Sequence, residues 1–360
     1  MQALTSQQRV CRMFERRDHD RVPRFDHYWP ETIRRWQGEG LVGDEKSVLD
    51  LLKGDYHACC WCWPQVFPGQ EQIVEQDEQT KVVRDGHGKL VRHWKHKSGT
   101  PEHLGFGCDS RQVWEDTYKN RLIQNGVQLD LDDIKRNYRR GRDAQQWCYL
   151  ACVEPFEETR ALMGDEISLM AMIEDPQWIR DVAQTFTDIV VLNCEAVMAT
   201  GVEPDGLWVY GDMAFNHSTV CSPQTYRELI WPEHQRLAQW AHQHGMKCIY
   251  HTDGDVRGVI DLYIEAGIDC LQPLEAKASM DVRTLCPPYG DRMAFFGNIN
   301  AVVMCTNDRN QIEQEIRSKL EAGMATRGYA YHSDHSVPPN IDWDTYRFII
   351  DLLDRYGNYQ

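Results

Sequence analysis

The feature that most constrains the fold is a repeated unit of helix, glycine and short apolar strand, which begins near residue 146. Helical segments end at Gly201, Gly245 and Gly267, and apolar runs of strand length such as GLWVY and MKCIYH follow them. No hairpin turn separates consecutive strands, so the pattern predicts parallel strands joined by helical crossovers. The strands are almost wholly apolar, as expected where helices cover both faces of a sheet.

Such units either close as a (β/α)8 barrel or stack as a doubly wound open sheet. At least five units follow residue 200, and the N-terminal third can supply the rest. A doubly wound sheet usually carries a glycine-rich phosphate loop, and neither GxGxxG nor GxxxxGK[ST] occurs. We therefore predict an α/β fold with one (β/α)8 TIM barrel domain over residues 1–360 and an N-terminal helical extension.

Residues 71–97 differ from the rest of the chain in their sequence pattern. β-branched and charged residues alternate there around Asp85-Gly86 and His87-Gly88, which is typical of two strands joined by a glycine-bearing turn. We predict an inserted β-hairpin that covers one end of the barrel as a lid or a docking surface.

Charge and composition exclude several classes of protein. Lys and Arg number 39 against 55 Asp and Glu, a net charge of −16, which argues against nucleic acid or an anionic membrane as the main partner. No window approaches about 18 consecutive apolar residues, and no apolar secretion segment opens the chain. We expect a cytoplasmic protein whose 13 cysteines are reduced, with Cys59, Cys60 and Cys62 serving as small core residues.

Polar residues gather where the predicted strands end. In a parallel barrel the carboxyl ends of the strands meet at one mouth and carry the chemistry. The strand ends read Asp26-His27-Tyr28-Trp29, Tyr210-Gly211-Asp212, His251-Thr252-Asp253-Gly254, Gln272-Pro273-Leu274-Glu275, Gly297-Asn298-Ile299-Asn300 and His332-Ser333-Asp334-His335-Ser336.

His251, Asp253 and His335 form a candidate metal site. His251 and Asp253 are two residues apart on an extended strand end, so their side chains point to the same side. His335 reaches them across the mouth if the barrel closes. Two imidazoles and one carboxylate with an open position are typical of catalytic zinc or non-haem Fe(II). Glu275 is a fourth candidate, as a ligand, a partner that orients His251, or a general base.

Structural roles remain open for several of these residues. Asp212 can cap the helix that must begin after it, and Asn298 and Asn300 can cap the GNINA turn. His332 and Asp334 suit hydrogen bonding within the last loop.

The C-terminal 160 residues resemble the uroporphyrinogen decarboxylase-like superfamily. The resemblance is carried by YGDMAF, MKCIYHTDG, AGIDCLQPLEAKASMDV, FFGNINA and GYAYHSDHSVPPNIDWDTYRFIIDLL, and more weakly by VPRFDHYWPE. It implies a (β/α)8 barrel and one of two chemistries, which are decarboxylation of porphyrinogens and zinc-dependent methyl transfer linked to corrinoid or coenzyme M.

The N-terminal strand end disfavours the decarboxylases. Those enzymes carry an arginine-bearing stretch that holds the many carboxylates of the substrate, whereas residues 25–31 here contain two acids and no arginine. An acidic, aromatic pocket is a poor receptor for a polyanionic tetrapyrrole, because burying like charges together is costly.

The methyltransferase branch implies a ligand set that this chain alters. The branch binds zinc through a His-x-Cys at one strand end and a Cys near the last strand. His251 matches the histidine, while Asp253 and His335 stand at the two cysteine positions. These harder ligands donate less charge and leave the metal a stronger Lewis acid, which suits an oxygen donor better than a thiol.

The resemblance and the altered ligands together predict a zinc-dependent methyltransferase. It would remove the methyl group of a small O-methyl substrate, an aryl methyl ether, and pass it to the Co(I) of a corrinoid protein, with Fe2+ as the alternative metal. The corrinoid would come from the partner, since no Asp-x-His-x-x-Gly motif occurs. A decarboxylase-like lyase and a non-catalytic binding protein are the alternatives, and a homodimer is left open.

Each strand-end residue receives a predicted role. Asp212 or Glu275 would protonate the departing oxygen or fix the metal shell, and Tyr28, Trp29 and Tyr210 would form the apolar wall. The substrate-binding set is completed by Asp26, His27, Asn298 and His332.

Overall fold

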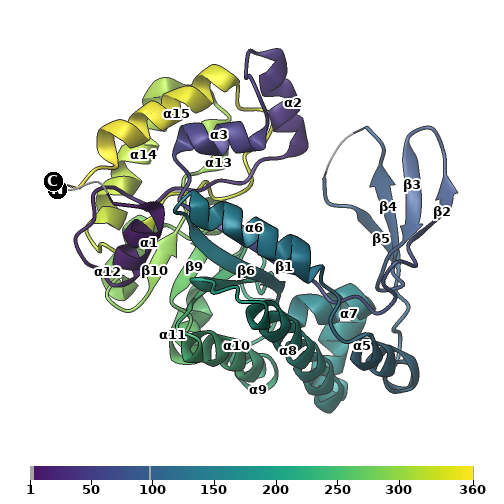
Figure 1. Ribbon diagram of the computed structural model, residues 1–360. Coiled ribbons are helices and arrows are strands. Elements are labelled where there is room, and N and C mark those ends of the chain that lie inside the picture. The colour runs from purple at the N-terminus through teal and green to yellow at the C-terminus, as the bar shows by residue number, and fades with distance from the viewer. Residues whose placement is uncertain (1–3, 97–98, 360) are drawn as a thin grey trace.

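The computed structural model describes residues 4–96 and 99–359, and its central element is a parallel sheet of seven strands in sequence order (Figure 1). The strands are β1 (Tyr56–Cys62), β6 (Trp147–Val153), β7 (Gly206–Tyr210), β8 (Lys247–Thr252), β9 (Cys270–Pro273), β10 (Ala294–Phe296) and β11 (Tyr329–Ala330). Within this sheet each strand pairs in parallel with the next one in the order given. The predicted α/β barrel topology is confirmed.

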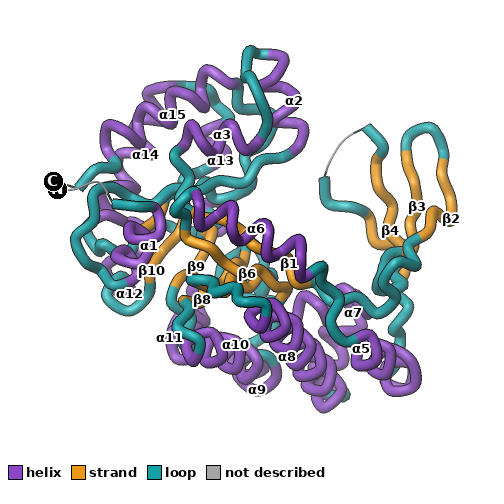
Figure 2. The backbone as a smooth tube through the Cα atoms, viewed as in Figure 1, coloured by secondary structure: helices purple, strands orange, loops and turns teal. Residues whose placement is uncertain are grey.

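Helices cover the outer side of the strands (Figure 2). Those after β6 are α7 (Pro155–Glu174), α8 (Pro176–Ala199), α9 (Pro223–Leu229), α10 (Trp231–Gln243), α11 (Ile260–Ala266), α12 (Val282–Tyr289), α13 (Ala301–Met304), α14 (Arg309–Met324) and α15 (Trp343–Tyr356). Gly164 forms a kink inside α7, with φ of +78°. The chain continues as helix because the residues beyond the kink, to Glu174, are again helix formers.

The N-terminal half supplies further helices outside the repeating units. They are α1 (Ser6–Phe14), α2 (Pro30–Gly38), α3 (Glu45–Leu52), α4 (Arg111–Val113), α5 (Lys119–Asn125) and α6 (Leu131–Asp143). α1 is the predicted N-terminal extension, and Thr5 caps it by accepting the Gln8 N–H.

An extended segment takes the eighth position and closes the barrel. The Tyr331 N–H donates to the Pro23 carbonyl at 2.8 Å, and the Phe25 N–H donates to the Tyr331 carbonyl at 3.1 Å. On its other side, the Arg24 carbonyl accepts the Asp55 N–H at 2.8 Å. The segment therefore bridges β11 and the start of β1.

One buried carboxylate anchors this closure. Asp55 is fully buried, and its oxygens accept hydrogen bonds from Arg9 Nη1 at 2.6 Å and Arg21 Nη1 at 2.7 Å. They also accept the Arg24 backbone N–H at 2.8 Å. The cluster ties α1, the closing segment and β1 together.

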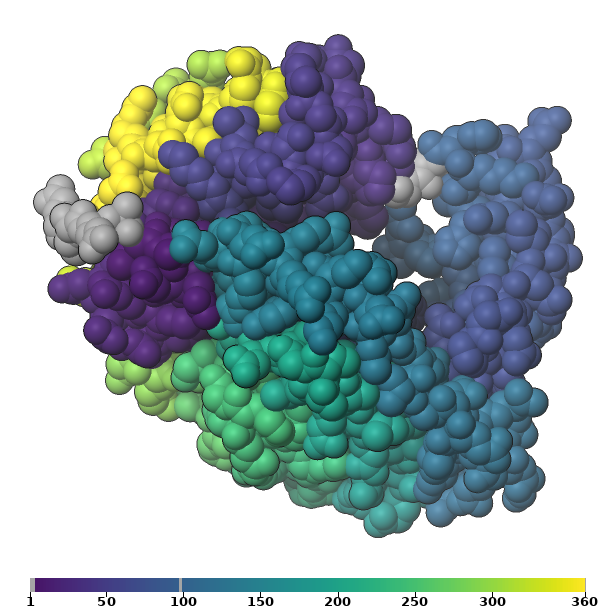
Figure 3. Space-filling view, viewed as in Figure 1, coloured from purple at the N-terminus to yellow at the C-terminus, as the bar shows by residue number. Residues whose placement is uncertain are grey.

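The insertion is a four-stranded antiparallel sheet that contains the predicted hairpin. Its strands are β2 (Gln72–Gln76), β3 (Thr80–Arg84), β4 (Leu90–Trp94) and β5 (Glu102–Gly105). Residue 97, the last of the predicted insertion, lies outside the described residues. The hairpin prediction missed β5, because PEHLG lacks the alternation of β-branched residues that marks β3 and β4. The sheet stands beside the barrel with a hollow between them (Figure 3).

Within residues 4–96 and 99–359, α8 is the one helix whose length and composition would allow it to cross a membrane. Of its apolar window 56% is buried, and it packs against α7 and α10. Its apolar residues pack in the hydrophobic core of the protein. Cys59 and Cys62 are also buried in this core, and Cys60 is half-buried.

We expect Asp55→Asn to lower the free energy of unfolding by about 3–5 kcal/mol, because Arg21 would lose its counter-ion and Arg9 would keep only its ion pair with Asp20. Urea denaturation followed by circular dichroism measures this. Asp50→Asn is the matched control, since its ion pair with Lys46 is exposed and should contribute less than about 1 kcal/mol. Equal effects of the two substitutions would contradict the anchoring role of Asp55.

Candidate functional site

Three neighbouring strands place Tyr210, His251 and Gln272 side by side at the barrel mouth. The register pairs Tyr210 with His251 and His251 with Gln272. The Tyr210 and His251 rings lie 5.0 Å apart. His251 Nδ1 lies 2.5 Å from Gln272 Oε1, and an amide oxygen can only accept a hydrogen bond. Nδ1 therefore carries a proton, which leaves Nε2 as the ring nitrogen that can bind a metal ion.

Two carboxylates join His251 in a compact group of potential metal ligands. One ligand atom each from Asp212, His251 and Asp253 lie within 4.8 Å of one another. His251 Nε2 lies 3.8 Å from Asp212 Oδ1, and that oxygen accepts the Asp253 N–H at 2.9 Å. Asp253 Oδ1 is inaccessible to solvent and has no hydrogen-bond partner in the described part of the chain.

These donors fit a divalent cation. A buried carboxylate oxygen without a partner is costly, and an ion shared with the imidazole and the second carboxylate would remove that cost. Nitrogen and oxygen ligands of this kind suit Zn2+ and also Fe2+. Burial raises the pKa of Asp253 to about 6. The negative charges of Asp212 and Glu275 also raise this pKa, whereas His251 and His335 lower it.

Glu275 holds the loop that carries Asp253. Its carboxylate accepts the Gly254 N–H at 2.9 Å and pairs with Lys277 Nζ at 2.7 Å. Gly254 has φ of +84°, and a Cβ there would lie 2.5 Å from the carbonyl carbon of Ala214. The loop is thus fixed tightly, and Glu275 acts here as a positioning residue; its predicted roles as ligand and proton donor stay predictions.

His335 lies near the group but outside it. Its ring stacks on Trp29, with centroids 6.2 Å apart, and its Nδ1 is 3.4 Å from the Ser336 carbonyl oxygen. The sequence predicted His335 as the third ligand beside His251 and Asp253, whereas the group of three contains Asp212. Ligation by His335 stays a prediction.

His27 and His332 form a second imidazole pair at the mouth. His332 Nδ1 donates to the Ser333 carbonyl, so its Nε2 accepts from His27 Nδ1 at 2.9 Å. Burial lowers the pKa of His332 to about 3 and holds that of His27 well below its usual value, so both rings are neutral at pH 7. Asp26 lies behind them, fully buried, and accepts from Ser333 N at 3.0 Å and Tyr346 Oη at 2.9 Å.

Two predicted substrate contacts, Tyr28 and Asn298, form hydrogen bonds within the protein, and substrate binding by them stays a prediction. The Tyr28 hydroxyl lies 2.8 Å from the hydroxyl of Tyr346, within the core. Asn298 is fully buried, where its Oδ1 accepts the Val282 N–H and its Nδ2 donates to two backbone carbonyls. Neither residue lines the pocket described below, because their polar atoms bond within the protein. Asn300 caps α13, as the alternative interpretation of that turn predicts.

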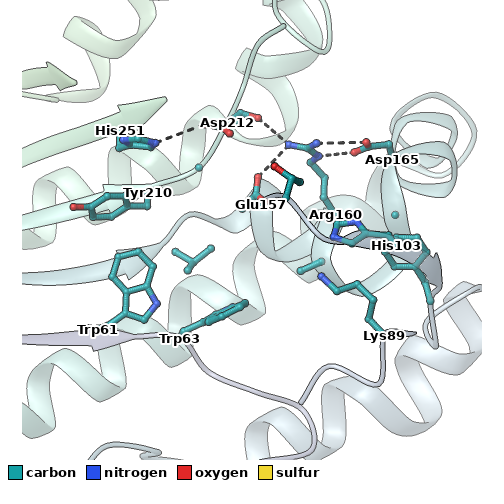
Figure 4. A pocket seen from close by; sticks show the side chains of 16 residues that line it. Trp61, Trp63, Lys89, His103, Glu157, Arg160, Asp165, Tyr210, Asp212 and His251 are labelled. Carbon is teal, nitrogen blue, oxygen red and sulfur yellow. Dashed lines mark hydrogen bonds and ion pairs between the residues drawn. The ribbon is translucent and has the colours of Figure 1, made fainter. Parts of the chain in front are cut away.

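A pocket of about 560 Å³ opens beside the metal-ligand group (Figure 4). Asp212 and His251 line one part of it, together with Tyr210. Its aromatic wall comes from Trp61 and Trp63, and the rest of the lining includes Lys89, His103, Phe106, Glu157, Arg160 and Asp165. The size and the aromatic wall are typical of a small-molecule site, and the charged and polar groups of the lining can orient a bound ligand.

Sequence reasoning missed most of this lining. Trp61 and Trp63 stand two residues apart at the end of β1 in HACCWCWP, a segment interpreted through its cysteines alone. The two tryptophans at alternate positions of a strand end were the available signal. Lys89 and His103 depend on how the inserted sheet folds over the mouth, which no local pattern specifies.

The family and structural comparisons agree with this architecture. The uroporphyrinogen decarboxylase (URO-D) family model matches residues 152–356. A methyltransferase from Methanosarcina mazei shares 13% identity over 98% of this chain and 99% of its own, with a TM-score of 0.67. A chitinase from Chromobacterium violaceum shares 10% identity over 92% of this chain and 98% of its own, with a TM-score of 0.40. No curated protein sequence matches the chain.

We expect the purified protein to hold about one divalent ion per chain. His251→Ala and Asp253→Ala should each abolish stoichiometric binding, since each removes one of the ligand atoms. Elemental analysis after dialysis measures the metal content. His244→Ala is the control, because His244 bonds to the Trp240 carbonyl of its own helix. A full complement of metal in His251→Ala would exclude the group as the binding site.

The hydrogen bond from His251 to Gln272 gives a second expectation. Gln272→Leu removes the acceptor that orients the ring, and such changes typically weaken metal affinity by about 10- to 100-fold. Gln272→Glu keeps an acceptor and should retain most of the affinity. Competition with a chromogenic chelator measures both constants, and unchanged affinity in Gln272→Leu would refute the orienting role.

Proposed function

The chain belongs to the uroporphyrinogen decarboxylase (URO-D) family, and we propose that it is a metal-dependent methyltransferase. In this proposal it removes the methyl group of an O-methyl substrate, an aryl methyl ether, and delivers it to the Co(I) of a corrinoid held by a partner protein. Zinc is the metal that we propose, with iron as the alternative.

The observation that carries the proposal is the unpaired, buried Oδ1 of Asp253 beside His251 Nε2 and Asp212. This ligand-rich group stands next to a pocket with aromatic walls, which suits an aromatic ring that bears a metal-directed oxygen. The fold shared with a methyltransferase is compatible with the same chemistry.

A methyl ether is inert because the alkoxide or phenolate is a poor leaving group. A divalent ion held by Asp212, His251 and Asp253 would supply Lewis acidity at the ether oxygen, worth several kcal/mol. Tyr210 and Trp61, with ring centroids 4.7 Å apart, would hold the substrate ring and keep water away from it.

The departing oxygen also needs a proton. Asp212 lines the pocket, whereas the carboxylate of Glu275 is bound to Gly254 and Lys277. Of the two roles that the sequence offered for Asp212, we therefore assign it to the metal shell, where an ionised carboxylate has no proton to give, and the departing oxygen takes its proton from solvent water. His27 and His332 are neutral and hydrogen-bonded to each other, which joins the closing segment to the last loop, and substrate binding by them stays a prediction.

A tetrapyrrole decarboxylase is a poorer fit to the pocket. Arg160 is already bound to Asp165 at 2.5 Å and to Glu157 at 3.1 Å, so its charge is compensated. Lys89, whose ion pair with Asp85 is 3.7 Å long, is the one other Lys or Arg among the described lining residues, and these two cations are too few for a substrate with many carboxylates.

We expect methoxylated aromatic compounds to convert a Co(I)-corrinoid protein to methyl-Co(III) when mixed with this protein, visible as a change in absorbance. His251→Ala and Asp253→Ala should slow the reaction by about 100-fold or more, since they remove metal activation worth several kcal/mol. His244→Ala should be fully active. Metal-independent release of carbon dioxide from a porphyrinogen, without methyl transfer, would overturn the proposal in favour of a lyase.

A further inference from the structure

Three buried polar side chains, Glu154, His234 and Tyr226, form a hydrogen-bonded array that runs from the barrel mouth into the helix layer. Glu154 follows β6 directly and is fully buried, and its Oε2 lies 3.0 Å from His234 Nε2. His234 lies on α10, and its Nδ1 lies 2.8 Å from the hydroxyl of Tyr226 on α9. A carboxylate can only accept hydrogen bonds, so Nε2 donates to Glu154 and Nδ1 accepts from Tyr226.

Glu154 also fixes the first turn of α7. Its Oε2 accepts the Phe156 N–H at 2.8 Å, and its Oε1 accepts the Glu157 N–H at 2.7 Å. The N-terminus of a helix favours a negative charge, so these two bonds and the bond from His234 compensate for the burial of the carboxylate. The array therefore fixes the start of α7 relative to α10.

The metal-ligand residue Asp212 is connected to the array at two points. Gly211 packs directly on Glu154, because a Cβ there would lie 1.8 Å from Glu154 Cγ, so only glycine fits at this position. Arg160, which α7 carries, donates from Nη1 to the Asp212 carbonyl at 3.2 Å (Figure 4). Both contacts hold the backbone of Asp212, whose carboxylate lies 3.8 Å from His251 Nε2.

The array does more than a helix cap requires. One side-chain oxygen is sufficient to cap a helix, and an exposed Ser or Asp usually provides it. Here the capping carboxylate is fully buried, and a histidine and a tyrosine that are 2% and 1% exposed fix its orientation. None of the three side chains belongs to the group of metal ligands or to the described pocket lining. Their effect on the site therefore passes through Gly211 and Arg160.

We propose that this array positions Asp212 for metal binding, with His234 as the positioning residue that orients Glu154. The inference rests on the proposed function for the presence of the metal. It goes beyond that function by giving a role to residues that contact neither the metal ligands' ion nor the substrate. Groups that orient metal ligands typically contribute about 10- to 100-fold to metal affinity.

Metal affinity measures this role without methyl transfer. Co2+ is titrated into the full-length, metal-free protein, and its visible absorbance reports both the dissociation constant and the coordination geometry. His234→Leu removes both hydrogen bonds of the ring, so it should weaken Co2+ binding by about 10- to 100-fold and change the absorption spectrum. His234→Gln keeps a donor toward Glu154 and should retain most of the affinity and the wild-type spectrum.

Asn193→Leu is the matched control for the loss of buried hydrogen bonds. Asn193 lies on α8, is 1% exposed, donates to the Ile189 carbonyl and accepts the Gln128 N–H. This variant should lose stability in urea denaturation and bind Co2+ as the wild type does. Tyr226→Phe keeps the test decisive if His234→Leu does not fold. It should weaken Co2+ binding by about fivefold, the loss expected for one hydrogen bond.

The two proposals fail in different ways. Wild-type Co2+ affinity and spectrum in His234→Leu and Tyr226→Phe, or an equal loss of affinity in Asn193→Leu, would overturn the positioning role and leave the metal site standing. A wild-type protein that binds no Co2+ would overturn the metal site and this inference with it. Co2+ binding that depends on the array, without methylation of Co(I), would support this inference and overturn the methyltransferase proposal.

Discussion

The architecture of the mouth depends on the burial of one carboxylate, that of Asp55. Its ion pairs with Arg9 and Arg21 and its bond to the Arg24 N–H hold an extended segment in the gap that seven regular strands leave open. Two charged guanidinium groups and their counter-ion are stable in this place only because every polar atom of the carboxylate is satisfied. The same segment carries His27 to its contact with His332.

Within the closed barrel, strand register decides which side chains meet. Parallel pairing aligns Tyr210, His251 and Gln272 in one row, so the aromatic wall, a metal ligand and the group that orients that ligand come from three consecutive strands. The loops that follow add Asp212 and Asp253 to the row. The repeated strand–helix unit is therefore sufficient to bring these residues together. The residues at the strand ends can vary while the barrel is kept.

The sequence predicted what local periodicity specifies and missed what tertiary packing decides. The alternation of helices and apolar strands was sufficient for the barrel, and two-residue spacing brought His251 and Asp253 together. The contact between the hydroxyls of Tyr28 and Tyr346 was not predicted, because the orientation of an irregular closing segment follows from its neighbours. Lys89 was invisible because its role depends on how an inserted sheet stands over a mouth more than 100 residues away along the chain.

The inserted sheet therefore has a functional meaning that the barrel alone does not give. In our proposal the barrel provides the metal-ligand atoms for the reaction, and the insertion completes the pocket with Lys89 and His103. Such a division separates chemistry from recognition, because the residues on the sheet can change without disturbing the row at the strand ends.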